Sequence, residues 1–145
     1  MKKIFIQTML LFFIGSATMA QAPGIFNYQG VARNEVGNAL SAKNINLKLT
    51  VREGSATGAQ VYSETRLVTT NTYGLFNVQI GSTGASSVVG TVTGVNWAAG
   101  NKFLQVEMDV NGGNNFVTMG ASQLASVPYA LNAAGAAPTD RKSVV

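Results

Sequence analysis

The sequence predicts an all-β protein: a single antiparallel β-sandwich of about seven strands, preceded by a signal peptide and followed by a short C-terminal helix. Several stretches alternate apolar and polar residues with period two, as strands with one buried face do. The chain has 16 Gly and only 3 Pro, and glycine-containing turns separate the alternating stretches. Its 145 residues leave room for one domain and its attachments.

Composition excludes several classes of site. The chain contains no Cys and no His, which removes disulfides, thiolate metal sites, a lipid-modified N-terminal Cys, Cys nucleophiles and His bases. The formal net charge of +4 arises mostly at the two ends, because residues 21–139 hold six basic and five acidic residues without a cluster. A nucleic-acid partner needs a basic stripe, so none is predicted.

Residues 1–20 have the features of a secretory signal peptide. Lys2 and Lys3 form its charged start, residues 4–14 are apolar, and small residues at 15–20 precede the cleavage site. Cleavage after Ala20 would make Gln21 the first residue of the mature protein. The alternative, a membrane anchor, needs about 20 apolar residues, more than this run offers. We therefore expect an exported protein, at the cell surface or outside a Gram-negative bacterium, that meets the membrane only during export.

The first predicted strands follow the leader. Residues 25–33 are extended, with Phe26 and Tyr28 on one side, and residues 34–38 form a turn in which Gly37 adopts positive φ. Residues 44–52 show the cleanest alternation in the chain. Its inward positions are Ile45, Leu47, Leu49 and Val51, and its outward positions are Asn46, Lys48, Thr50 and Arg52.

The third strand, at residues 60–70, breaks the alternation. Val61 and Val68 have opposite parity, so one face holds both only if the strand contains a bulge. In the fourth strand, residues 75–80, Phe76, Val78 and Ile80 share one face between two glycines. Burying each of these side chains contributes roughly 1.5–3 kcal/mol, which makes this strand a central element of the core.

The last strands lie between residues 81 and 121. We expect a short edge strand or turn at 88–96, with Trp97 closing one end of the core. Residues 102–110 form a strand, residues 111–115 a hairpin turn, and residues 116–119 the return strand. In the 102–110 strand the inward residues are Leu104, Val106, Met108 and Val110, and the outward residues are Gln105, Glu107 and Asp109.

The sandwich is thus assigned to residues 21–121, and residues 122–138 to a short helix and a linker toward a missing stalk. Leu124, Val127, Leu131 and Ala134 have helical spacing, and Pro128 fits the first turn of a helix at 127–134. Residues 139–145 are interpreted as a non-native tail. Residues 140–145 are what the codons GAT CGG AAG AGC GTC GTG encode, which resemble a common sequencing adaptor; the alternative is a genuine polar tail.

A family resemblance rests on five motifs in fixed order: NYQGVAR at 27–33, VYSET at 61–65, GLFNVQIG at 74–81, FLQVEMD at 103–109 and SVPYAL at 126–131. Together they resemble the N-terminal domain of exported tail-fibre-like and collagen-repeat surface proteins of Bacteroidetes-type bacteria. The third motif is also similar to the prealbumin-like, carboxypeptidase-regulatory type of β-sandwich. The resemblance implies a long downstream stalk through which the protein forms a homo-oligomer such as a trimer. It implies no catalytic residues.

Candidate sites are few. Glu107 and Asp109 share one strand face, as hydrolytic carboxylate pairs do, although solvated surface residues explain them as well. Residues 109–114 resemble part of a calcium loop but lack the closing Glu, and a hairpin explains them. Residues 81–84 are glycine-rich without the Lys and helix of a phosphate-binding loop. Ser63 and Thr65 have no base in any motif.

Three functions remain open. We expect a non-catalytic structural or interaction module at the start of an exported fibre or adhesin, without catalytic, cofactor-binding or metal-binding residues. Its partners would be its own stalk and a surface glycan or protein. The alternative is a small secreted carbohydrate-binding domain, in which Tyr62, Tyr73 and Trp97 would stack on sugars unless they belong to the core. The third is an exported hydrolase that uses Glu107 and Asp109.

Overall fold

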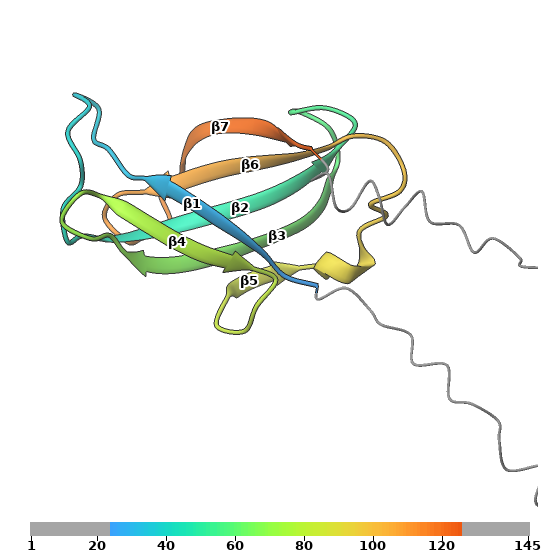
Figure 1. Cartoon of the computed structure of the whole chain (residues 1–145), viewed down its shortest axis with the longest axis horizontal. Helices are drawn as coiled ribbons and strands as arrows, with labels where there is room; N and C mark the ends of the chain where they lie inside the picture. The colour runs from blue at the N-terminus through green and yellow to red at the C-terminus, as the bar shows by residue number, and fades with distance from the viewer. Residues whose placement is uncertain (1–23, 126–145) are drawn as a thin grey trace, which may run out of the picture.

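The computed structural model describes residues 24–125, which form seven strands in two antiparallel sheets (Figure 1). The predicted all-β sandwich class is therefore confirmed. The predicted signal peptide, the predicted helix at 127–134 and the predicted non-native tail at 139–145 lie outside the described residues. Within residues 24–125, no helix is long and apolar enough to cross a membrane.

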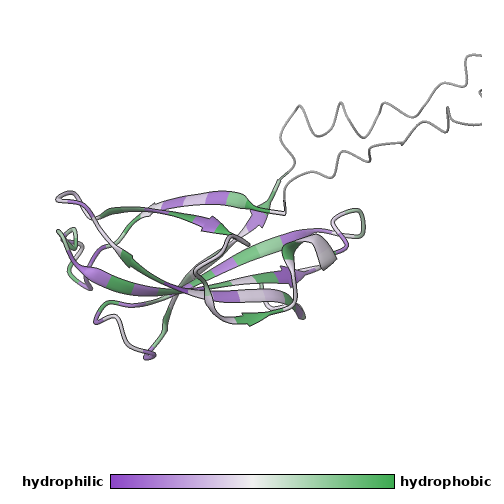
Figure 2. Ribbon diagram, turned by 90° about the horizontal axis from the view of Figure 1, so that it is seen from below, coloured by the Kyte–Doolittle hydropathy of each residue, from purple (hydrophilic) through white to green (hydrophobic). Residues whose placement is uncertain are grey.

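The larger sheet has five strands and the smaller sheet has two. The smaller sheet pairs β1 (Phe26–Val31) with β4 (Leu75–Ile80). In the larger sheet the order is β5 (Ser86–Val89), β3 (Gln60–Thr69), β2 (Asn44–Glu53), β6 (Lys102–Asp109) and β7 (Val117–Leu124). Figure 2 shows the layers from the side, with green apolar bands alternating with polar ones along the strands.

The smaller sheet confirms the predicted faces of its two strands. Phe76, Val78 and Ile80 are buried against the larger sheet, and Phe26 and Tyr28 of β1 pack partly against the same core. β1 runs antiparallel to β4, with Phe26 opposite Ile80 and Val31 opposite Leu75. The outer face carries four exposed amide side chains, those of Asn27, Gln29, Asn77 and Gln79.

The central strand β2 confirms the inward prediction and corrects the outward one. Ile45, Leu47, Leu49 and Val51 are fully buried. Two residues predicted to be exposed, Asn46 and Thr50, are also buried, at 9% and 1% exposure. β2 has strands on both sides, and longer side chains reach across its outer face: Arg52 donates to Gln105 Oε1 and to Gly58 O, and Lys48 pairs with Glu107 at 3.3 Å.

The bulge predicted in the third strand is present at Val61. Pairing between β2 and β3 passes from Val51–Tyr62 to Arg52–Gln60, so Val61 is an additional residue in β3. Val61 and Val68 both pack against the core. The register then places Glu64 opposite Leu49, on the core-facing side.

An edge strand or turn was predicted at 88–96. The structure has a short edge strand, β5, that begins earlier, at Ser86, and ends at Val89, and the predicted range itself contains one turn of 3₁₀ helix, η2 (Val92–Gly94). Trp97 does not close the end of the core, because it is 43% exposed and packs edge-to-face on Phe26, with ring centroids 6.0 Å apart. Its indole N–H donates to Val92 O at 2.9 Å. Val92 and Val95 supply the buried apolar side chains of this segment instead.

β6 buries Leu104, Val106 and Met108 as predicted, but Asp109, predicted to point outward, is only 4% exposed. The carboxylate of Asp109 turns into the hairpin loop that follows, where backbone amides bind it. β7 runs on to Leu124 and so is longer than the predicted return strand at 116–119. Its pairing with β6 passes over Met119, and Gly120 next to this bulge has φ +136°.

Candidate functional site

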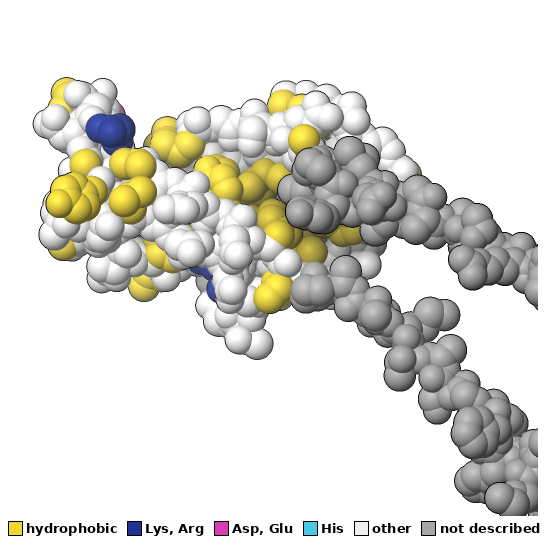
Figure 3. All heavy atoms as spheres, in the orientation of Figure 1, with side chains coloured by type: hydrophobic (Ala, Val, Ile, Leu, Met, Phe, Trp, Pro, Cys, Tyr) yellow, Lys and Arg dark blue, Asp and Glu magenta, His cyan; other side chains and the backbone are white. Residues whose placement is uncertain are grey.

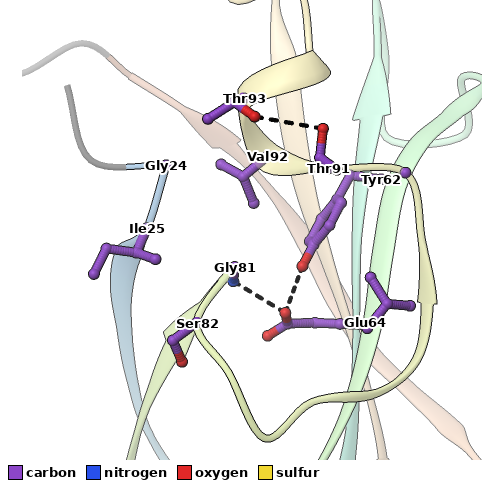
Figure 4. A pocket seen from close by; sticks show the side chains of 11 residues that line it. Gly24, Ile25, Tyr62, Glu64, Gly81, Ser82, Thr91, Val92 and Thr93 are labelled. Carbon is purple, nitrogen blue, oxygen red and sulfur yellow. Dashed lines mark hydrogen bonds between the residues drawn. The ribbon is translucent and has the colours of Figure 1, made fainter. Parts of the chain in front are cut away.

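A pocket of about 360 Å³ lies at the edge of the sandwich where both sheets end (Figure 4). β3 supplies Tyr62 and Glu64 to its lining, and the segment around η2 closes the opposite side. The remaining lining residues come from the start of the described chain, the turn after β4, and β5 with the residues that follow it: Gly24, Ile25, Gly81, Ser82, Val88, Gly90, Thr91, Val92 and Thr93.

The most polar group of the pocket is Glu64, whose side chain has no solvent exposure. Its carboxylate accepts a hydrogen bond from the Tyr62 hydroxyl at 2.5 Å and one from the Gly81 backbone N–H at 3.0 Å, as Figure 4 shows. Arg66 Nε donates to the other oxygen at 2.5 Å. Tyr62, Glu64 and Arg66 follow the bulge at Val61 and alternate along β3, so all three lie on its core-facing side.

Arg66 extends the cluster to the turn after β4. Besides contacting Glu64, its guanidinium donates to Ser82 O at 2.6 Å and to Thr83 O at 3.2 Å. Glu64 binds the same turn through Gly81 N. The ion pair thus connects β3 of the larger sheet to the end of β4 in the smaller sheet. Its geometry is that of a structural clamp between the layers.

The phenol of Tyr62 acts as a hydrogen-bond donor here. Burial raises its pKa far above the usual value of 10.0, and the hydrogen bond to Glu64 and the charge of that carboxylate raise it further. Tyr62 therefore stays protonated at neutral pH. The Glu64 carboxylate accepts hydrogen bonds from three residues, Tyr62, Arg66 and Gly81.

The rest of the pocket is apolar with a hydroxyl rim. Ile25, Val88 and Val92 supply apolar surface. Thr91 is the N-cap of η2 and accepts a hydrogen bond from Gly94 N at 3.0 Å, and the Thr93 hydroxyl lies 3.5 Å from that of Thr91. The Ser82, Thr91 and Thr93 hydroxyls of this recess contact backbone groups or one another, and none of the three is hydrogen-bonded to a base, which nucleophilic catalysis would require.

The predicted carboxylate pair does not form a joint site. Glu107 lies 3.3 Å from the Lys48 ammonium on the outer face of the larger sheet. Asp109 instead accepts hydrogen bonds from Asn111 N and Asn115 N, both at 2.8 Å, inside the β6–β7 hairpin. The two carboxylates therefore act separately, one in an ion pair and the other in organising a loop.

The same contacts account for the loop that resembled a calcium site. The backbone amides of Asn111 and Asn115 hold the pKa of Asp109 below its usual value, although its burial acts in the opposite direction. Both carboxylate oxygens are thus directed toward the loop backbone. In the described part of the chain, no group of three or more Asp and Glu side chains converges as a metal site would require.

The three aromatics considered for sugar stacking are dispersed. Tyr62 is only 2% exposed, so the interpretation as an exposed aromatic is wrong for it. Tyr73 is 74% exposed just before the start of β4, whereas Trp97 packs on Phe26, which lies opposite the last residue of β4. A six-residue strand separates these positions by roughly 20 Å. They form no common platform.

The Glu64–Arg66 cluster was not predicted from sequence, although the signal for it is there. Glu64 and Arg66 lie four and two residues before the apolar Val68, so regular alternation places all three side chains on the core-facing side of the strand. Two opposite charges on the core-facing side of a strand must pair with each other or with backbone.

Comparison with known proteins adds a family to this geometry. No curated protein and no solved structure matches the chain. A family model, described as a domain of unknown function (DUF8740), matches residues 27–122, a range that extends from β1 through β6 and most of β7. The chain therefore belongs to the DUF8740 family.

Proposed function

We propose that this chain is an exported, non-catalytic module that begins a cell-surface fibre or adhesin-like protein and presents the far end of its sandwich to a partner. The observation that carries the proposal is the position of the chain ends. The first and last described residues leave the domain at the same end, in both views (Figures 1 and 2). In the described residues, the opposite, distal end is formed by loops alone, as suits a module mounted on a stalk.

The distal end is built from the connection between β1 and β2, the turn before β4 and the β6–β7 hairpin. Two large apolar side chains on it are strongly exposed: Val36 at 79% and Tyr73 at 74%. The loops that carry them are in contact, because Ala32 N–H donates to Gly74 O at 2.8 Å. Exposed aromatic and aliphatic groups on connecting loops are typical of interaction surfaces.

These loops are held in defined conformations. The Asn34 side chain accepts hydrogen bonds from Val36 N at 3.2 Å and Asn38 N at 2.9 Å. The Asn71 side chain does the same for Tyr73 N at 2.8 Å and Leu75 N at 3.0 Å. A binding surface ordered in advance loses less conformational entropy when a partner binds.

Export is tested by placing an epitope tag in the β2–β3 loop, at residues 54–59, and probing intact cells of a Gram-negative host. We expect antibody to reach the tag from outside, and mass spectrometry to find Gln21 as the first residue. A matched variant that lacks residues 1–20 should stay inside the cell. Recovery of the tagged chain from the cytoplasm with its leader intact would contradict the proposal.

The distal surface is tested with beads that carry the purified protein and are scored for binding to cells of the producing bacterium or its surroundings. Tyr73→Ala combined with Val36→Ser should reduce bead binding by at least about tenfold, as loss of central interface residues does. Val89→Ser, which removes a 55% exposed side chain from β5, is the control. Equal binding by all three proteins would remove the distal end as the interaction surface.

A further inference from the structure

The outer face of the smaller sheet carries amide side chains and no charge. Four outward positions of β1 and β4 form two cross-strand pairs, Asn27 with Gln79 and Gln29 with Asn77. All four side chains are exposed, and neither strand contains a charged residue. In Figure 3 the surface over β1 and β4 is mostly white, that is, neither hydrophobic nor charged, and the charged side chains that are visible lie near its margins.

The register of the two strands makes these amides a compact array. Ala32 donates to Gly74 O at 2.8 Å, and the β1–β4 register continued by one residue places these two directly opposite each other. In an antiparallel ladder, hydrogen-bonded pairs alternate with pairs whose side chains lie closer together. Both amide pairs are of the closer kind, with Cα atoms about 4.5 Å apart across the strands. Along the strands the two pairs are about 7 Å apart.

The two sheets use the polar groups of their outer faces differently. On the larger sheet, Arg52 donates to Gln105 Oε1. On the same face, Lys48 pairs with Glu107 at 3.3 Å. The amides of the smaller sheet form no such side-chain contact within residues 24–125. Each of them therefore presents two N–H donors and an oxygen acceptor to the solvent.

The edge of β1 adds backbone groups to this array. β4 lies next to β3, so the other edge of β1 lies above β6 and β7, and no strand of the described chain pairs with it. The backbone groups of Tyr28 and Gly30 point toward β4, because they are in phase with the Ala32 hydrogen bond. Those of Asn27 and Gln29 point to the open edge. The same two residues thus offer donors and acceptors both on the face and along the edge.

The chemistry of this array matches hydroxyl groups. A hydroxyl both donates and accepts hydrogen bonds, as an amide does, whereas a carboxylate only accepts and an ammonium only donates. Anionic polymers and acidic lipid surfaces require basic residues, and the two strands contain none. The core of a protein interface is rich in aromatic and apolar groups. We propose that the outer face of the smaller sheet binds a neutral polysaccharide through the side chains of Asn27, Gln29, Asn77 and Gln79.

The core holds the amide array in a fixed position. Phe76, Val78 and Ile80 are buried on the opposite face of β4, and Tyr28 of β1 packs against the same core. Binding groups carried by strands keep their geometry better than groups on loops. Each hydrogen bond to a sugar replaces one to water, so one domain binds weakly, and the repeated units of a polysaccharide compensate through multiple contacts. This surface is separate from the distal end and adds a ligand class to the proposed function.

Sedimentation of the purified protein with insoluble cellulose, chitin, mannan and curdlan tests the proposal. We expect at least one of these neutral polysaccharides to retain the protein at about 0.15 M salt. Raising the salt to about 1 M should leave retention unchanged, because screening acts on charges and the array has none. Retention by none of the four, or release at the higher salt concentration, would overturn the proposal.

Variants locate the site on the sheet. Gln29→Ala combined with Asn77→Ala should weaken retention about tenfold, as the loss of two ordinary hydrogen bonds does. The matched control, Asn114→Ala combined with Gln123→Ala, removes one Asn and one Gln that are exposed elsewhere and should leave retention unchanged. Gln29→Glu keeps the size of the side chain but loses its N–H donors, so it should weaken retention without disturbing the sheet. Unchanged retention in the Gln29 and Asn77 variants, or an equal loss in the control, would overturn the proposal.

The distal surface and the amide array can fail separately. Tyr73→Ala combined with Val36→Ser should leave retention on polysaccharide unchanged, even where it abolishes the binding of beads to cells. Retention that falls as far in this pair as in the Gln29 and Asn77 variants would overturn the proposal, because the site would then include the distal end.

Discussion

Arg66 binds the carboxylate of Glu64, two residues earlier in the same strand, with Nε 2.5 Å from Oε1, and both side chains lie on the core-facing side of β3. Residues i and i+2 of a strand share a face, so this pair is formed within one strand. What makes it a clamp is the third partner, the turn after β4, which contributes one N–H and two carbonyl groups.

Removing the cation of this clamp should be strongly destabilising. Arg66→Met leaves the fully buried Glu64 carboxylate without its charge partner, which typically costs about 3–5 kcal/mol. Lys48→Met breaks the more exposed Lys48–Glu107 pair and should cost less than about 1 kcal/mol. Urea denaturation of both variants measures the difference, and equal midpoints would show that the clamp contributes no more than a surface pair.

The contribution of the Tyr62 hydroxyl to the free energy of unfolding should decrease at alkaline pH. Tyr62→Phe removes a donor to a buried carboxylate, at a cost of about 1–3 kcal/mol. The folded pKa of Tyr62 is raised above 10.0, so its contribution is complete below pH 10 and declines as pH rises toward the folded pKa. Denaturation between pH 8 and 11 should show this decline in the parent and a weaker one in Tyr62→Phe. Tyr73→Phe, at a 74% exposed position, should behave like the parent.

Asp109 should make the β6–β7 hairpin sensitive to acid. Its folded pKa lies below the ordinary value of 3.8, so its contribution is present above about pH 4 and is lost as pH falls through the folded pKa. Asp109→Asn should therefore lower stability at pH 7 and flatten the acid limb of a stability–pH curve. Glu35→Gln, in an exposed turn, is the control. An unchanged acid limb in Asp109→Asn would show that these amide contacts do not perturb the carboxylate.

Gly30 is expected to be intolerant of any side chain because β1 passes close to Phe76. A Cβ at position 30 would lie 2.6 Å from Phe76 Cζ, a distance that forces the ring to move. Gly30→Ala should cost about 1–3 kcal/mol through overpacking. Thermal unfolding of Gly30→Ala, Phe76→Leu and the double variant tests the cause. The double variant should lose less than the sum of the single losses, and strict additivity would contradict the contact.

The period-two patterns were sufficient to predict most strand faces. Ile45 through Val51 in β2, Phe76 through Ile80 in β4 and Leu104 through Met108 in β6 are buried as their alternation indicated. The opposite parity of Val61 and Val68 predicted a bulge that the β2–β3 register contains. These predictions succeed because the alternation of side chains across a strand is a local property of the backbone.

The candidate site was not predictable in the same way. Glu64 and Asp109 are buried only because backbone amides from other segments or from a turn reach their carboxylates. Asn46 and Thr50 are buried because β2 occupies the centre of the larger sheet. No sequence pattern states which strands become neighbours, so the burial of a polar residue on the nominally outer face stays undetermined until they pair.

The sequence alone therefore determined the fold class, the apolar face of each central strand and the main turns, because local backbone geometry dictates them. Tertiary structure decided how the strands divide between two sheets, that β4 lies beside β3, and that β1 keeps an open edge above β6 and β7. It also decided the Glu64–Arg66 clamp, since a buried charge is stable only where folding brings its donors within hydrogen-bond distance.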